Sequence, residues 1–222
     1  MSAFLGPIHF QMYEKIKTVS SRSVAVFSTF FEKFGTEVEE VCGCSKSEAE
    51  SWVDNTPLDQ QIGDAAIHGW LSGKVDEAES REARLVKALL EKYGDSGRAL
   101  VLEAVYWHGK AVGLKAAEKH SPETLEELVG VVSAYLLDGM PCDSVVKNFL
   151  SGGFLSSEHS KCLHVPNWDE SGADTVFMCD IVRRWIDGFC ESINPDFKHD
   201  GKERVVSGDE KCVDVYRLEK KP

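Results

Sequence analysis

The sequence predicts an α+β fold, in which a helical N-terminal two-thirds packs on a small antiparallel sheet formed by the C-terminal third. Apolar residues recur at spacings of three and four through most of residues 1–140, which is the period of amphipathic helices. Residues 141–222 instead hold short apolar stretches between turn residues, so they predict a mixed α/β region. Because that region is too small to bury a hairpin alone, we expect it to pack on the helices as one compact domain.

The first helices are indicated by their ends as well as by their spacing. A helix is predicted over residues 8–34, since Pro7 suits a first helical position and Gly35 suits a helix stop. Ser45 and Glu48 have the spacing of a capping box, so a second helix is expected to begin there.

Longer helices are expected to follow a boundary at Pro57. They are predicted over residues 58–93, 95–119 and 122–137. Gly97, Gly109 and Gly113 in the second of these helices predict close packing between helices. The alternative is that they allow the backbone to approach a ligand.

The C-terminal region is predicted to combine short strands with one helix. Strand-like segments are expected at residues 162–165, 175–178, 204–206 and 212–218, with a helix at 179–192 and turns at 151–154 and 207–210. The helix is expected to end at Asn194-Pro195, since the residue before a proline disfavours helical backbone.

The composition argues against several classes of partner and chemistry. The chain of 222 residues carries a formal net charge of −12, which disfavours nucleic acid and anionic membrane surfaces as partners. No stretch approaches the ~20 apolar residues of a membrane span, and the N-terminus shows no signal-peptide pattern. Phosphate-binding glycine motifs, the Gly-x-Ser-x-Gly elbow and the His-Glu-x-x-His motif are absent. We therefore expect an acidic cytoplasmic protein that binds a small molecule, with a homodimer left open.

Cysteine and histidine residues gather in the C-terminal region, where they could form a site. Cys162, His164, Cys179 and Cys212 combine thiolate and imidazole groups, which suit zinc or another divalent metal, although their spacing matches no standard zinc module. A second interpretation is a reactive thiol at Cys179, because a helix N-terminus lowers a thiol pKa. The neighbouring Asp180 would oppose that effect. The third interpretation is that the cysteines are simply packed as small hydrophobic residues.

Three short motifs carry a family resemblance. They are the segment Tyr93–Gly113, the pair Cys179-Asp180, and the turn Gly208-Asp209-x-x-Cys212 with its aliphatic strand. In this order they resemble the L-2-amino-thiazoline-4-carboxylic acid hydrolase-like family over residues 90–218. The last motif is also similar to the small-molecule-binding 4-vinyl reductase domains, in which helices pack on a small antiparallel sheet and cysteines lie near the C-terminus.

The resemblance implies a hydrolase that opens a small cyclic C–N or C–S compound. In this hypothesis Cys179 is the nucleophile or a ligand, and Asp209 orients a base or a water molecule. Cys212 and His164 complete the site. The alternative hypothesis is a non-catalytic, sensor-like protein that binds a small molecule or a metal with the same residues, and a third is a structural dimerisation protein.

Overall fold

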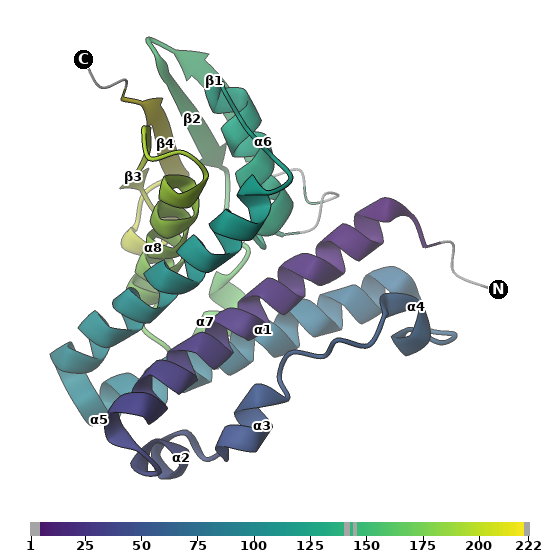
Figure 1. Cartoon of the computed structure of the whole chain (residues 1–222), viewed down its shortest axis with the longest axis vertical. Coiled ribbons are helices and arrows are strands. Elements are labelled where there is room, and N and C mark those ends of the chain that lie inside the picture. The colour runs from purple at the N-terminus through teal and green to yellow at the C-terminus, as the bar shows by residue number, and fades with distance from the viewer. Residues whose placement is uncertain (1–4, 140–142, 144–145, 220–222) are drawn as a thin grey trace. The chain divides into compact units, whose positions relative to one another are not determined.

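The computed structural model describes residues 5–139, 143 and 146–219, and it has an α+β fold with a four-stranded antiparallel sheet in its C-terminal third (Figure 1). In chain order the elements are α1 (Pro7–Phe34), α2 (Glu37–Cys42), α3 (Lys46–Glu50), α4 (Leu58–Gln61), α5 (Ile67–Ala117), α6 (Leu125–Tyr135), β1 (Val146–Ser151), β2 (Phe154–His159), α7 (Val165–Glu170), α8 (Thr175–Ile193), β3 (Phe197–Glu203), a 3₁₀ turn (Val205–Ser207) and β4 (Cys212–Leu218). The predicted fold class is confirmed. None of the described helices is both long enough and apolar enough to cross a membrane.

The chain forms two compact units. The first, called here the helical unit, comprises the described residues up to Leu100 together with Tyr135–Leu137 and Asn167–Ala173. The second, called the sheet unit, comprises the described residues of Val101–Ala134, of Asp138–Pro166 and from Asp174 onward. Helix α5 contributes to both units, and it bends at Gly94, whose φ of 54° lies outside the helical region.

The helical unit is built around α1 and the N-terminal half of α5. Pro7 at the start of α1 and Gly35 at its end confirm the predicted boundaries, and the Ser45–Glu48 capping box opens α3 as expected. Phe27 and Phe30 on α1 are fully buried, as a helix with one apolar face requires.

One predicted helix is interrupted and another starts late. The helix predicted over 58–93 begins at Leu58 as the short α4, but it stops at a turn at Gly63 with a φ of 53°, and α5 starts only at Ile67. The helix predicted over 122–137 begins at Leu125, because Thr124 caps it by accepting the N–H of Glu127 at 3.2 Å. In the second case a side-chain cap decides the boundary.

The sheet unit contains one antiparallel sheet with the strand order β1-β2-β4-β3. Helix α8 covers one face of this sheet, and the C-terminal half of α5 packs on α8 (Figure 1). A side chain at Gly109 would collide with the carbonyl of Trp185, and one at Gly188 would collide with the carbonyl of Tyr106. The two helices can approach this closely only because these positions have no Cβ. The close packing predicted for Gly109 and Gly113 is therefore confirmed.

Several predicted strands are wrong. Residues 175–178 form the first turn of α8, because the carboxylate of Asp174 accepts the N–H of Phe177 at 3.0 Å and caps the helix. Residues 162–164 form a bend and Val165 begins α7, and residues 204–206 belong mainly to the 3₁₀ turn, the preceding strand being β3. The two strands of the β1–β2 hairpin were not predicted, although its turn was. All six residues of β1 are exposed, so no alternating pattern marks it as a strand.

Candidate functional site

The face of the sheet that α8 covers is unusually polar. Residues Cys212, Asp214 and Tyr216 alternate along β4 and therefore point to the same face. Asp214 contacts Arg183 of α8, which fixes this face as the covered one. His159 on β2 lies directly opposite Cys212, so it belongs to the same face.

The centre of this face is an ion-pair cluster of Arg183, Asp187, His199 and Asp214. One oxygen of Asp214, Oδ1, lies 3.0 Å from Arg183 Nε and 3.1 Å from His199 Nε2. The other imidazole nitrogen of His199, Nδ1, lies 2.8 Å from Asp187 Oδ1. The side chain of His199 is only 1% exposed, so these carboxylates are what its ring contacts in place of water.

The two carboxylates favour the charged form of His199. Burial disfavours the imidazolium, but the hydrogen bonds to Asp187 and Asp214 outweigh it, so the pKa of His199 is raised. With both ring nitrogens donating, the imidazolium ties β3 to α8 and β4. It has no lone pair left with which to accept a proton from a thiol.

Arg183 also connects this cluster to the backbone of β3 and β4. Its Nη2 donates to the carbonyl oxygens of Glu203 at 2.5 Å and Val213 at 3.2 Å. The guanidinium fits there because Gly201 has no side chain, and a Cβ at that position would collide with it. Its remaining nitrogen, Nη1, is buried and has no hydrogen-bond acceptor within the described residues.

His159 presents a second buried donor on the same face. Its Nε2 lies 2.5 Å from Asp138 Oδ2. Burial disfavours the charged ring, but the Asp138 carboxylate outweighs it and raises the pKa of His159. The other nitrogen, Nδ1, is buried and lacks an acceptor in the part of the chain that the structure describes.

The two predicted site thiols, Cys179 and Cys212, both have raised pKa values. Cys179 lies in the second turn of α8, and burial raises its pKa to about 11 although Arg183 and Arg204 oppose the shift. Burial also raises the pKa of Cys212, against the effect of the Val205 N–H, which donates to Sγ at 3.3 Å. The predicted lowering of the Cys179 pKa is therefore wrong, because α8 begins four residues earlier than expected and the thiol is largely buried.

The two aspartates of the predicted motifs contact one arginine. Asp180 Oδ1 lies 2.6 Å from Arg204 Nη1, and Asp209 Oδ2 accepts the backbone N–H of Arg204 at 2.8 Å. Asp209 is exposed, and the preceding Gly208 has a φ of 96°. The Gly-Asp-x-x-Cys motif thus closes the connection between β3 and β4, with Asp209 and Cys212 both accepting backbone N–H groups.

The predicted metal ligands do not come together as a metal site. Cys162 and His164 lie in the bend before α7, whereas Cys179 and Cys212 lie on α8 and β4. Across residues 5–139, 143 and 146–219, no group of three or more His, Cys, Asp or Glu side chains is placed to hold a metal ion. A strand at 162–165 would have aligned the first pair, and that strand is absent.

The residues that make up the cluster were not among the predicted site residues. Alternation along β4 places Asp214 and Tyr216 on the face opposite Val213 and Val215, yet Asp214 and Tyr216 are the residues that face α8, with Asp214 9% exposed and Tyr216 3% exposed. Arg183 and Asp187 are four apart on α8, a spacing that places them on one helix face. That spacing is the signal that could have pointed to a charged inner face.

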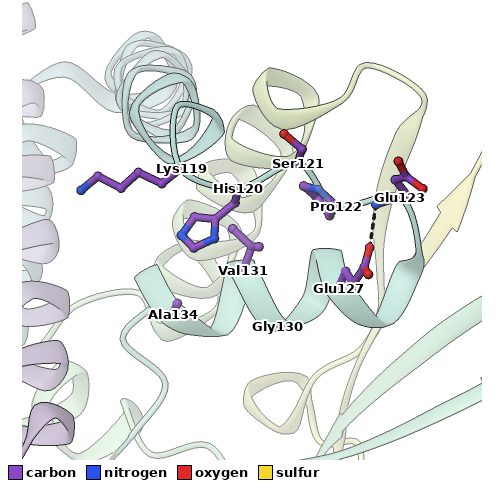
Figure 2. A pocket seen from close by; sticks show the side chains of 9 residues that line it. All are labelled: Lys119, His120, Ser121, Pro122, Glu123, Glu127, Gly130, Val131 and Ala134. Atoms are coloured by element: carbon purple, nitrogen blue, oxygen red, sulfur yellow. Dashed lines mark hydrogen bonds between the residues drawn. The ribbon is translucent and has the colours of Figure 1, made fainter.

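A surface pocket of about 470 Å³ also opens in the sheet unit, where α5 ends and α6 begins (Figure 2). Figure 2 shows Glu127 reaching back to the N–H of Glu123, and its carboxylate lies 2.8 Å from that nitrogen and 3.2 Å from the N–H of Thr124. Since Glu127 already binds these helix-start N–H groups, they are not available to an anionic ligand. The pocket shares no lining residue with the ion-pair cluster.

Comparisons with known proteins found no relative. No family model matches the chain, and no curated protein and no solved structure matches it. The chemistry of the site is therefore inferred from its own geometry.

Proposed function

We propose that the sheet unit binds a small carboxylate-bearing compound beside Cys212. The observation that supports this most is the pair of buried donors, Arg183 Nη1 and His159 Nδ1, neither of which meets an acceptor among the described residues. Both belong to side chains that flank Cys212: His159 lies opposite it on β2, and Arg183 binds the carbonyl of the next residue, Val213.

The energetics of buried donors favour an acidic ligand. A buried N–H without an acceptor costs about 1–3 kcal/mol, and more when the group is charged. A carboxylate supplies two acceptor oxygens, and its hydrogen bonds to a guanidinium and an imidazolium are charge-assisted and hence strong. A neutral ligand would offset less of the free-energy cost of the two unmatched donors.

The same geometry favours binding over thiol catalysis. With a pKa of about 11, Cys179 is almost entirely protonated near neutral pH. His199, the most buried imidazole, is held by Asp187 and Asp214 through both nitrogens and so does not serve as a base. A sensor-like binding protein is therefore our first proposal.

A ring-opening hydrolase is the second proposal, and one observation favours it. Arg183 and Arg204 both lower the pKa of Cys179, so their charges would stabilise a thiolate once it formed. The compound that names the resembled family is itself a small carboxylic acid with a ring of carbon, nitrogen and sulfur. In such a reaction water adds to the carbon between sulfur and nitrogen, the C–S bond breaks, and sulfur leaves as a thiol that takes up a proton.

Calorimetry with 2-amino-thiazoline-4-carboxylate and its uncharged carboxamide tests the first proposal. We expect the acid to bind and the amide to bind at least tenfold more weakly, since a hydrogen bond to a charged group contributes roughly 1.5–3 kcal/mol. The variant Arg183→Lys keeps the charge but removes Nη1, and it should lose about tenfold in affinity for the acid. Arg217→Lys is the matched control, because Arg217 alternates with Tyr216 and points to the opposite face of the sheet.

Two results would contradict the binding proposal: equal affinity for acid and amide, or unchanged affinity in a folded Arg183→Lys protein. The same samples separate the two proposals. New thiol groups appearing with time in the wild type, and not in Cys179→Ala, would establish the hydrolase. Stable binding without the release of thiol groups would support the proposal of a sensor-like binding protein.

A further inference from the structure

The helical unit contains a second cavity, which shares no residue with the sheet unit. Its volume is about 250 Å³, and it lies among α1, the segment after α3 and the N-terminal half of α5. Its lining combines aromatic, aliphatic and charged side chains: Tyr13, Ile16, Lys17, Ser20, Ser51, Trp52, Asp54, Gln61, Lys74, Glu77, Ala78 and Arg81.

The inner wall of this cavity is rigid and apolar. Ile16 and Ala78 are buried on facing helices, and Tyr13 is 5% exposed. The hydroxyl of Tyr13 donates to the carbonyl of Asp54 at 3.4 Å and also contacts the amide of Gln61. These contacts hold the Tyr13 ring in place, with Lys17 Nζ 5.3 Å from its centre, so the ring forms part of the cavity wall.

The charged side chains at its rim carry an excess of positive charge. Three cations, Lys17, Lys74 and Arg81, face two carboxylates, Asp54 and Glu77. This contrasts with the chain as a whole, whose net charge is −12. Lys17 is paired with Glu14 at 2.5 Å, so the unmatched positive charge lies at Lys74 and Arg81, which share the single carboxylate of Glu77.

The carboxylates of the cavity are already occupied. Glu77 Oε2 lies 2.8 Å from Lys74 Nζ, and Glu77 Oε1 lies 3.3 Å from Arg81 Nη1. Asp54 Oδ1 accepts the N–H of Thr56 at 2.8 Å, and this contact is the main reason that the Asp54 pKa is lowered. Glu77 is thus shared by two cations, and Asp54 directs one of its oxygens to its own loop.

Arg81 supplies such a donor. Its Nη2 donates to Ser20 Oγ at 2.9 Å, and its guanidinium lies 5.4 Å from the centre of the Trp52 ring. Its Nε is buried, and the described residues offer it no acceptor. The guanidinium is therefore fixed in position by Ser20, Glu77 and Trp52, while one of its N–H groups stays unmatched.

We infer that this cavity is a binding site for a small aromatic carboxylate, separate from the site proposed in the sheet unit. The ring packs against Tyr13 and Trp52, and the carboxylate pairs with Arg81 and Lys74. The volume suits a compound with a single ring, since drug-sized ligands need pockets of roughly 300–1,000 Å³. The inference does not depend on what the sheet unit binds.

Calorimetric titration of the full chain with benzoate, benzamide and cyclohexanecarboxylate tests this inference. We expect benzoate to bind at least tenfold more tightly than benzamide, which lacks the charge, and more tightly than cyclohexanecarboxylate, which lacks the flat ring. Equal binding of benzoate and benzamide would overturn the inference.

Variants then locate the site. Arg81→Gln and Lys74→Gln should each weaken benzoate binding, the first by about tenfold or more, with Arg84→Gln as the control because Arg84 is exposed and lines no described part of the cavity. Lys74 lies at the rim, so its variant reports on the site even if Arg81→Gln unfolds the protein. Unchanged benzoate affinity in a folded Lys74→Gln protein would overturn the inference. Loss of benzoate binding in Arg183→Lys with retention in Arg81→Gln would also overturn it, since the acid would then bind the sheet unit.

Discussion

Each unit buries one arginine against a carboxylate, and the two pairs differ in how completely they are matched. In the helical unit, Arg22 Nε and Nη2 lie 2.7 and 2.6 Å from the two oxygens of Glu82, a two-pronged pair whose side chains are 5% and 2% exposed. In the sheet unit, Arg183 shares a single oxygen of Asp214 with His199 and keeps Nη1 without an acceptor among the described residues.

The Arg22–Glu82 pair is therefore structural, whereas Arg183 keeps a donor that could still bind a ligand. The Arg22–Glu82 pair joins α1 to α5 and directs two donors to two acceptors. The Arg183 cluster instead leaves a charged donor, Nη1, without an acceptor among the described residues, and His159 Nδ1, on the strand opposite Cys212, is a second such donor. Buried donors of this kind are rare in native proteins, and a ligand is one physical reason for them.

The largest effect is expected from breaking the closed pair. Glu82→Gln removes the carboxylate that hydrogen-bonds the buried Arg22 and leaves only the more weakly acting Glu79 nearby, which should lower the free energy of unfolding by about 3–5 kcal/mol. Urea unfolding followed by circular dichroism measures this loss. The pair of Lys17 with the exposed Glu14 is the control, and Glu14→Gln should change stability by less than about 0.5 kcal/mol. Equal effects of the two changes would mean that burial does not distinguish these pairs.

A smaller effect is expected from the helix contact that supports the cluster. Gly188→Ala places a methyl group against the carbonyl of Tyr106 and should cost about 1–3 kcal/mol by forcing α5 and α8 apart. Gly130→Ala is the matched change on α6, where nothing lies within 4 Å of the added Cβ, and it should be neutral or stabilising by up to about 1 kcal/mol. Thermal unfolding of both variants gives the comparison, and a tolerated Gly188→Ala would contradict the close packing.

The two arginine pairs should also differ in their response to pH. The folded pKa of His199 is raised above the ordinary value of 6.5, so its stabilising contribution is complete below pH 6.5 and is lost as the pH rises through the folded pKa. The difference in unfolding free energy between wild type and His199→Gln should therefore shrink above pH 6.5, by about 1.4 kcal/mol for each unit of pKa shift. The guanidinium of Arg22 does not titrate in this range. A difference that grows with pH would show that His199 is neutral in the fold.

The smallest effect is expected at the exposed turn. Asp209→Ala removes the acceptor for the Arg204 N–H and should cost about 0.5–1.5 kcal/mol, with Glu210→Ala as the neighbouring exposed control. Ligand binding by the sheet unit should be retained. A variant with full stability and no binding or turnover would instead support the catalytic role that the resemblance implies for Asp209.

The elements that depend on local signals could be predicted from the sequence. Pro7 and Gly35 bound α1 because a proline and a glycine act on the backbone at their own positions. Ser45 and Glu48 form their capping box within one turn of helix. Gly109 was predicted to mark a close helix contact, and the closeness of Trp185 confirms it.

The candidate site depended on tertiary packing and could not be predicted in the same way. A strand with Val213, Asp214 and Tyr216 suggests that the valine side is buried, yet Asp214 faces α8 because Arg183 and His199 neutralise it there. The thiol pKa values depend on burial, which the position of a cysteine along the chain does not reveal.

The most direct test of the account is the nitrogen NMR spectrum of the histidine rings during titration with 2-amino-thiazoline-4-carboxylate. The account predicts that Nδ1 of His159 shifts as it gains an acceptor, whereas both nitrogens of His199 stay unchanged because Asp187 and Asp214 already bind them. The resonances are assigned with His159→Gln and His199→Gln. A bound carboxylate that leaves the His159 ring unchanged would contradict the claim that this buried donor is part of a ligand site.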